Sequence, residues 1–260
     1  MRLDCGKVTA RRIKVQISYD GTSYHGWQVQ PGQETVQGVL QRVLTGLARE
    51  PILVAGSGRT DAGVHALGQV GAFTLHNRIP VDGLKLAMNR LLPDDIRVLS
   101  VEEADPDFDP RRHATAKTYE YRIVRTPVCS PFERRYVCHH PFPLDEPAMM
   151  RLAPILEGEH DFSAFAATDV RDALGYSKVR KIFSSSLTRA GDRLIYRVRG
   201  SGFLKHMVRN IVGTLLEVGK GNFTPSDVAR ILASGDRRQA GPTAPARGLF
   251  LLRVEYVEKC

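Results

Sequence analysis

A glycine-rich segment from Gly56 to Ala66 places one carboxylate, Asp61, two residues after a guanidinium, Arg59. Its three glycines within eight residues oppose a helix, because each costs about 1 kcal/mol of helix propensity relative to alanine. Glycine also lets another molecule approach the main chain closely. The pattern suits a turn on which a single carboxylate does chemistry. Taken alone, it fits an aspartate that merely caps a turn even better.

Two phosphate-binding motifs are excluded for this segment. A P-loop ends in Gly-Lys-Ser/Thr, whereas Gly63 is followed by Val64 and His65. A dinucleotide fingerprint reads G-x-G-x-x-G, and here the third glycine is misplaced. Asp61 is the only acidic residue of the segment, so a metal site of paired carboxylates has little support.

A second candidate is the strand-like stretch from Lys117 to Arg122, in which cations and tyrosines interleave. Alternation along a strand places Lys117, Tyr119 and Tyr121 on one face. Aromatic rings on a sheet stack on nucleobases, and neighbouring cations neutralise phosphates. An amphipathic strand that buries its tyrosines against a helix is an equally common alternative.

The third candidate is a helix predicted at 203–218, whose apolar residues recur on one face. Lys205 and Arg209 are four residues apart and are expected side by side at the edge of that face. A cation in such a place is partly desolvated and pairs strongly with a carboxylate. Two solvated basic side chains are the simpler alternative.

The hydrophobic pattern predicts an α+β protein of two similarly built halves, residues 1–110 and 111–260, joined near 105–112. Strands are expected at 13–19, 51–57, 67–75, 96–103, 115–124, 179–189, 193–200 and 248–257. Helices are expected at about 36–47, with Thr35 as N-cap, and at 81–92, 146–156, 203–218 and 225–234. A hairpin turn is expected at Ala190-Gly191-Asp192. Asp61 then lies in the first half, and Tyr119 and Arg209 lie in the second.

The charge balance is basic, with 37 Lys and Arg against 28 Asp and Glu, a net charge of +9 and a pI near 9.6. A pI above about 9 is typical of nucleic-acid-binding domains. A solvated basic surface is an equally frequent alternative. Because the arginine pairs at 111–112, 134–135 and 237–238 are far apart, a folded surface rather than a basic tail is expected to collect the charge.

The sequence predicts a cytoplasmic protein without a disulfide framework or a metal site. No apolar run approaches the roughly 20 residues that span a bilayer, and the N-terminus lacks the apolar region of a secretory signal. The four cysteines, Cys5, Cys129, Cys138 and Cys260, form no CxxC pair. Two histidines follow Cys138, but this spacing fits no usual zinc motif.

Five segments, in order along nearly the whole chain, carry a resemblance to a known family. They are Asp20-Gly21-Thr22-x-Tyr24-x-Gly26-Trp27-Gln28, the Gly-Arg-Thr-Asp-Ala-Gly-Val-His core at 58–65, Lys117-Thr118-Tyr119, Gly202-Phe203-Leu204-x-His206-Met207-Val208-Arg209-Asn210, and Gly241-Pro242-Thr243-Ala244-Pro245-Ala246-x-Gly248-Leu249. Together, in register, they resemble the tRNA pseudouridine synthase A (TruA) family. This outweighs the local alternatives given above for each candidate.

The resemblance implies an α+β fold of two ferredoxin-like (RRM-like) halves, with mainly antiparallel sheets side by side and an active cleft between them. It implies an isomerase that converts uridine to pseudouridine at positions 38, 39 and 40 in the anticodon stem-loop of tRNA. No cofactor and no catalytic metal is implied. The expected partners are tRNA and a second copy of the chain in a homodimer, with no membrane.

The resemblance also implies a role for five residues. Asp61 matches the catalytic nucleophile, and Tyr119 matches the tyrosine that stacks on the target base and removes its C5 proton. Arg209 matches the cation that pairs with Asp61. Arg59 matches the arginine that helps to hold the flipped nucleotide, and Leu249 the apolar floor of the pocket. The route at Asp61 stays open between attack on C1′, attack on C6 and a glycal.

One segment departs from the family pattern. Residues 108–114 read Phe-Asp-Pro-Arg-Arg-His-Ala, where many members carry Phe-His-Ala-Arg-Phe. The departure lies outside the residues assigned to chemistry and bears only on the local backbone and RNA contacts.

Two other functions are weighed against the leading one. They are a pseudouridine synthase that acts on other uridines, and a non-catalytic tRNA-binding or tRNA-folding protein that uses the same basic cleft. The intact set of Asp61, Tyr119 and Arg209 favours an enzyme, because binding a polyanion requires no carboxylate.

Overall fold

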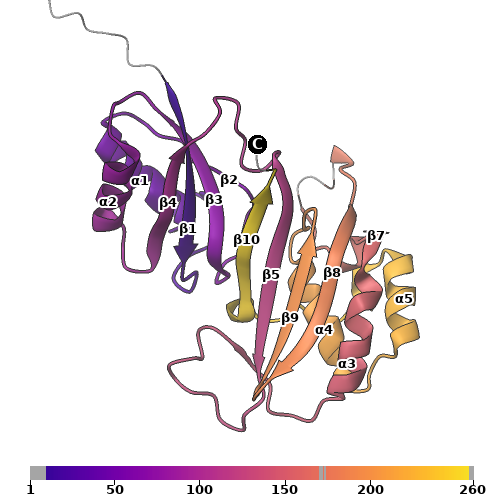
Figure 1. Ribbon diagram of the computed structural model, residues 1–260. Coiled ribbons are helices and arrows are strands. Elements are labelled where there is room, and N and C mark those ends of the chain that lie inside the picture. The colour runs from indigo at the N-terminus through magenta and orange to yellow at the C-terminus, as the bar shows by residue number, and fades with distance from the viewer. Residues whose placement is uncertain (1–9, 170–171, 173, 258–260) are drawn as a thin grey trace, which may run out of the picture. The chain divides into compact units, whose positions relative to one another are not determined.

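The computed structural model describes residues 10–169, 172 and 174–257, and the chain forms two compact units (Figure 1). Unit 1 is Met1–Ala114 with Tyr256–Cys260, and unit 2 is Thr115–Glu255. Both units combine helices with mostly antiparallel strands, so the predicted α+β class is confirmed. Within the described ranges, no helix is both long enough and apolar enough to traverse a bilayer.

Unit 1 follows a β-α-β-β-α-β path. Its elements are β1 (Arg11–Tyr19), α1 (Val36–Ala48), β2 (Ala55–Gly56), β3 (His65–Leu75), α2 (Val81–Leu91) and β4 (Ile96–Glu103). The strands lie in the order β4-β1-β3-β2, and each neighbouring pair is antiparallel.

The core of unit 1 follows from the sequence periodicity. Alternate residues of β1, from Ile13 to Tyr19, are buried, as a strand with one covered face requires. The helix α1 begins after the predicted cap Thr35, whose side chain accepts a hydrogen bond from the Gly38 amide. Figure 1 shows α1 and α2 on the same side of the sheet, and α2 contacts β4.

Unit 2 repeats the same path and then adds to it. Its elements are β5 (Ala114–Val124), β6 (Cys138–His139), α3 (Glu146–Leu152), β7 (Gly158–Asp161), β8 (Val179–Ala190), β9 (Arg193–Gly200), α4 (Met207–Gly219), α5 (Pro225–Ser234) and β10 (Leu249–Tyr256). The strands lie in the order β10-β5-β9-β8-β7, with β6 parallel to the end of β5. Through β5, α3, β8, β9, α4 and β10, unit 2 has the strand order of unit 1.

Two tyrosines lie at the centre of unit 2. Tyr121 on β5 pairs with Tyr196 on β9, and both are fully buried. The Tyr196 hydroxyl is 2.9 Å from the hydroxyl of Ser185 on β8. The β8–β9 hairpin turns at the predicted residues, and Gly191 there has φ of 61°, the left-handed region that favours glycine.

The predicted strand at 51–57 is wrong in its extent, because only Ala55–Gly56 pair with the sheet. The preceding residues are bonded by side chains of α1 instead. The Val54 amide donates to Gln41 Oε1 (3.2 Å), and its carbonyl accepts from Gln37 Nε2 (2.7 Å). A backbone satisfied in this way has no need of a partner strand.

Two predicted helices are also wrong in extent. The helix expected at 203–218 begins only at Met207, because His206 adopts a left-handed conformation with φ of 61°. The helix expected at 146–156 is α-helical to Leu152 and continues as a 3-10 turn over Ala153–Leu156. Pro154 accounts for this change, since it lacks an N–H and its ring crowds the preceding turn.

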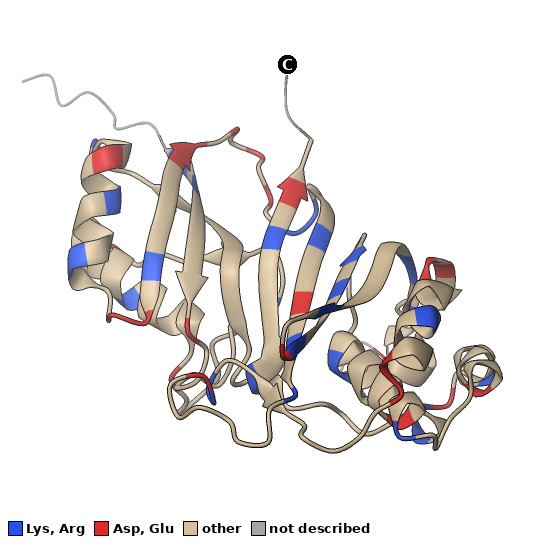
Figure 2. Ribbon diagram, turned by 60° about the horizontal axis from the view of Figure 1, so that its bottom comes forward, with Lys and Arg blue, Asp and Glu red and all other residues tan. Residues whose placement is uncertain are grey.

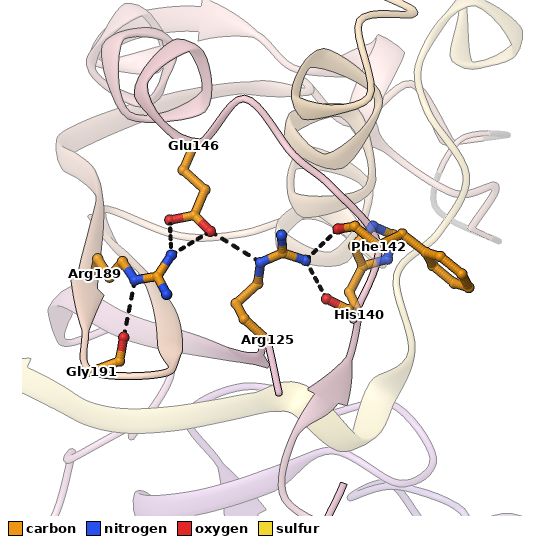
Figure 3. A network of polar contacts seen from close by, with 6 residues as sticks. All are labelled: Arg125, His140, Phe142, Glu146, Arg189 and Gly191. Carbon is orange, nitrogen blue, oxygen red and sulfur yellow. Dashed lines mark hydrogen bonds and ion pairs between the residues drawn. The ribbon is translucent and has the colours of Figure 1, made fainter. Parts of the chain in front are cut away.

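A polar network ties down the long connection between β5 and α3 (Figure 3). Arg125, just after β5, donates to Glu146 Oε1 (3.0 Å) and to the carbonyls of His140 and Phe142. Arg189 on β8 donates to both oxygens of Glu146, at 2.7 and 2.6 Å. Burial acts to raise the pKa of Glu146, but the hydrogen bonds from Arg189 and Arg125 outweigh it and hold this pKa below its usual value.

Candidate active site

Asp61 lies in the loop between β2 and β3 of unit 1. Its side chain is partly exposed, and Arg59 two residues earlier is exposed. The Val64 amide donates to the Asp61 carbonyl (3.1 Å), and Gly63 has φ of 75°. The glycine-rich segment therefore forms a turn, as predicted, and the turn presents its carboxylate at the surface of unit 1.

One glycine of this segment serves packing inside unit 1. A Cβ at Gly56 would lie 2.5 Å from atoms of the Trp27 indole, closer than side-chain carbons approach in proteins. The space beside Gly56 is thus filled by the protein itself. The expectation that the glycines admit another molecule is wrong at this position.

The Asp20–Gln28 segment holds the Asp61 loop in place. Trp27 donates its amide to the Thr60 carbonyl (3.1 Å), and the Gly63 amide donates to the Tyr24 carbonyl (3.2 Å). A Cβ at Gly26 would lie 2.5 Å from the Thr60 carbonyl oxygen. Sequence reasoning used this segment only for its family resemblance and missed its contact with the loop, for which its glycines were the available signal.

Tyr119 lies on β5 of unit 2 and is 7% exposed. Its ring meets the ring of Phe203 edge to face, with the centroids 5.0 Å apart and the planes at 77°. It occupies the same strand face as Tyr121, whose hydroxyl donates to the Pro245 carbonyl (2.8 Å). Every residue from Ala116 to Tyr121 is buried, so burial does not alternate along this part of β5.

Arg209 lies in the first turn of α4 and is half-buried. Its Nε donates to the Ala244 carbonyl (2.8 Å), and the Ala244 amide donates to the Arg209 carbonyl (3.1 Å). Lys205 precedes the helix, and its Nζ lies 3.3 Å from the Thr168 carbonyl. The prediction that Lys205 and Arg209 are neighbours on one helix face is therefore wrong, because the helix starts after Lys205.

The segment from Gly241 to Leu249 is fastened along α4. The Gly241 amide donates to Thr214 Oγ1 (2.9 Å), and Thr243 Oγ1 donates to Asn210 Oδ1 (2.7 Å). This segment leads into β10, where Leu249 is 5% exposed. The last two family-like segments thus form one packed substructure, which sets the position of both Arg209 and Leu249.

The predicted site residues are divided between the two units. Asp61 and Arg59 belong to unit 1, and Tyr119, Arg209 and Leu249 belong to unit 2. Unit 1 therefore contains the candidate carboxylate, and unit 2 contains the candidate aromatic ring, guanidinium and apolar side chain.

Lys and Arg residues occur on strands, helices and loops of each unit, as the blue segments of the ribbon in Figure 2 show. Part of this charge is neutralised locally on unit 2. Glu120 on β5 lies 2.9 Å from Arg122 Nε and 2.5 Å from Arg197 Nη2. Burial acts to raise the pKa of Glu120, but the hydrogen bonds from Arg197 and Arg122 hold it below its usual value. The spread of the charge agrees with the distribution of basic pairs in the sequence.

The cysteines are not gathered with other potential metal ligands in the described part of the chain. Among those residues, no three His, Cys, Asp or Glu side chains are placed to hold a metal ion. Cys129 and Cys138 are free thiols, and Cys5 and Cys260 lie outside the described residues. His139, next to Cys138 on β6, has its Nε2 2.8 Å from the Thr126 carbonyl.

Comparison with known proteins gives matches along nearly the whole chain. The family described as tRNA pseudouridine synthase matches residues 16–111 and 152–257. A tRNA pseudouridine synthase A of Solibacter usitatus (strain Ellin6076) is 60% identical over 246 residues, which cover 95% of this chain and 100% of that protein. A tRNA pseudouridine synthase A of Brevibacillus brevis is 46% identical over 248 residues, covering 95% and 100%. One of Geobacillus kaustophilus is 46% identical over 253 residues, covering 96% of each.

Proposed function

Because this chain belongs to the tRNA pseudouridine synthase family, as its five segments predicted, we propose that it isomerises uridine to pseudouridine at positions 38, 39 and 40 in the anticodon stem-loop of tRNA. The enzyme is an isomerase that acts on tRNA. The target positions and the roles of individual residues go beyond the family assignment and form the content of the proposal.

The observation that carries the proposal is the placement of Asp61. A partly exposed carboxylate is presented on a turn whose neighbours, Thr60 and Gly63, are hydrogen-bonded to a second segment of unit 1. A nucleophile held in one orientation reacts far faster than a mobile one. Asp61 attacks the target nucleotide, and the bond between N1 of uracil and C1′ of the ribose breaks.

The remaining steps conserve every atom of the uridine. The freed base turns, a bond forms between C5 and C1′, and C5 loses its proton while N1 gains one. On either attack route the bond to Asp61 breaks, which regenerates the carboxylate. No redox partner or external energy source is required. The choice between attack on C1′, attack on C6 and a glycal stays open.

In this proposal, unit 2 completes the site. Tyr119 stacks on the uracil and accepts the C5 proton, and Arg209 pairs with the carboxylate of Asp61. Arg59 holds the flipped nucleotide, and Leu249 forms the floor of its pocket. Extruding a base from a stem costs a few kcal/mol, and stacking on an aromatic ring returns about 1–3 kcal/mol.

The proposal includes two ferredoxin-like halves with an active cleft between them, a homodimer and a cytoplasmic location. The β-α-β-β-α-β path of each unit and their common strand order support the ferredoxin-like assignment. The net charge of +9 supports binding of a whole tRNA through its phosphates. Neither a cofactor nor a metal has a part in the proposed chemistry.

Replacing Asp61 by asparagine tests the proposal. We expect Asp61→Asn to abolish pseudouridine formation while tRNA binding is largely retained, because the amide keeps the shape and loses the nucleophile. Asp82→Asn, which changes an exposed aspartate on α2, is the matched control and keeps full activity. Mapping pseudouridines in tRNA incubated with each protein separates the alternatives. Product at other positions favours a different specificity, and tRNA binding without any product favours a tRNA-folding protein.

A further inference from the structure

A buried hydroxyl pair lies next to Asp61 in unit 1. The Tyr19 hydroxyl at the end of β1 is 2.8 Å from Oγ1 of Thr60, the residue that precedes Asp61. Tyr19 is 4% exposed and Thr60 is 6% exposed. This contact joins residues 41 positions apart, so the Tyr19 side chain connects strand β1 directly to the Asp61 loop.

A buried glutamine holds the same loop nearer to its start. Gln69 on β3 is fully buried, and its Oε1 accepts from the Ser57 hydroxyl (2.9 Å). Its Nε2 donates to the Gly58 carbonyl (2.9 Å). Side chains of β1 and β3 thus hold the loop at 57, 58 and 60, which leaves Asp61 as the next residue along.

The pairing of β1 with β3 is irregular at this point. Ile17 lies opposite Gln69 and Tyr19 lies opposite Ala66, with a register shift between them. Such irregularities re-aim side chains and are frequent beside active sites. Here the shift separates the pair that contains Gln69 from the pair that contains Tyr19, and both of these side chains bind the loop.

Thr60 is held at its main chain as well as at its side chain. Its carbonyl accepts from the Trp27 amide (3.1 Å), and the Trp27 ring lies 6.2 Å from that of Tyr19. Burial raises the pKa of Tyr19 to about 12, so its hydroxyl is neutral at physiological pH and is able to donate. Tyr19 therefore supports Thr60 through a hydrogen bond and does not act as a base at neutral pH.

We propose that Tyr19 is a positioning residue of the isomerase, whose hydroxyl acts through Thr60 to fix the orientation of Asp61. The inference rests on the proposed role of Asp61 as the nucleophile. Tyr19 is buried beneath the loop, so its effect on the reaction runs through Thr60. A displacement of about 1 Å in a reacting group is enough to cost about 100-fold in rate, which is why a single supporting hydrogen bond matters.

The variant Tyr19→Phe removes the hydroxyl and leaves the ring. We expect kcat to fall by about 10- to 100-fold, with KM for tRNA within about twofold of the wild-type value. The matched control is Tyr196→Phe, which removes another buried tyrosine hydroxyl bonded to a buried hydroxyl, that of Ser185 in unit 2. It is expected to lower the melting temperature by a similar amount and to leave kcat unchanged.

Substitution of the partner tests the same contact from the other side. Thr60→Ser keeps a hydroxyl for Tyr19 and retains most of the activity. Thr60→Val removes it and reproduces the kcat defect of Tyr19→Phe. The inference is overturned if Tyr19→Phe and Tyr196→Phe have the same kcat, or if Tyr19→Phe raises only KM.

Wild-type protein and Asp61→Asn are measured in the same assay, which distinguishes a failure of the proposed function from a failure of the proposed role of Tyr19. An inactive wild type or an active Asp61→Asn refutes the proposed function itself. An active wild type and an inactive Asp61→Asn, together with a fully active Tyr19→Phe, refute only the role of Tyr19.

Discussion

Gly213 on α4 is expected to be one of the least replaceable residues of unit 2. A Cβ at this position would lie 1.6 Å from the Pro242 carbonyl oxygen, whereas real Cβ atoms keep at least 3.0 Å from other heavy atoms. The clashing atom belongs to the main chain, so no side-chain rotation relieves the contact. In Gly213→Ala, the helix and the 241–244 segment must move apart by about 1.4 Å.

The energetic cost follows from the contacts that such a movement breaks. Overpacking by one methyl costs about 1–3 kcal/mol. Four hydrogen bonds join α4 to this segment, namely Gly241 to Thr214, Thr243 to Asn210 and the two between Arg209 and Ala244, and each contributes about 0.5–1.5 kcal/mol. Replacing a helical glycine by alanine returns about 1 kcal/mol of propensity. We therefore expect a loss of about 2–8 kcal/mol in the free energy of unfolding of unit 2.

Urea unfolding followed by circular dichroism measures this loss. The single tryptophan, Trp27, lies in unit 1, so its fluorescence reports that unit separately. The control is Gly46→Ala in α1, where no atom lies within 4 Å of the added Cβ. This control gains about 0.5–1 kcal/mol, because the same helix propensity is recovered without a clash. If Gly213→Ala is as stable as the wild type, the close approach of α4 to Pro242 is refuted.

Two further outcomes are expected. Arg209→Ala lowers kcat by about 10- to 100-fold with a smaller change in tRNA affinity, because its proposed partner is Asp61 rather than a phosphate. Steady-state turnover measures kcat, and filter binding measures the affinity for tRNA. A defect in affinity alone contradicts the pairing of Arg209 with Asp61. In a second test, Glu146→Gln reduces the decrease in melting temperature that the wild type shows as the pH falls. The folded pKa of Glu146 is held below 4.5 by Arg189 and Arg125, so its contribution is complete above pH 4.5 and is lost as the pH falls through the folded pKa. Melting temperatures between pH 3 and 7 check this, and parallel curves for the two proteins would exclude a role for the network.

Elements with a clear local signal were predictable from the sequence. The strands at 96–103 and 193–200 and the helix at 225–234 agree with β4, β9 and α5 to the residue, and Thr35 caps α1 as expected. β9 alternates buried and more exposed residues, and α5 begins after the capping residue Thr224; local sequence encodes both signals.

Elements decided by tertiary contacts were not predictable. The stretch 51–54 has strand-like composition, but side chains of α1 satisfy its backbone. The start of α4 depends on the conformation of His206, which no periodicity reveals. Local propensity yields to such contacts because it amounts to tenths of a kcal/mol per residue.

The candidate site divides in the same way. Asp61, Tyr119 and Arg209 were identified because they stand in recognisable segments. Their supports were missed, since the contacts of Tyr19 with Thr60 and of Arg209 with Ala244 join residues more than 30 positions apart. The sequence identifies the residues that carry reactive groups, but it does not identify the side chains that hold those residues in position.

The position of β10 has a consequence for synthesis of the protein. β5 lies between β9 and β10, yet β10 is formed by residues 249–256, which a ribosome delivers after every other described strand. During translation, the edge of β5 that pairs with β10 therefore stays uncovered, although the β8–β9 hairpin on its other side has already been synthesised. An uncovered strand edge invites pairing with another chain. The nascent polypeptide therefore exposes this edge of β5 until β10 leaves the ribosome.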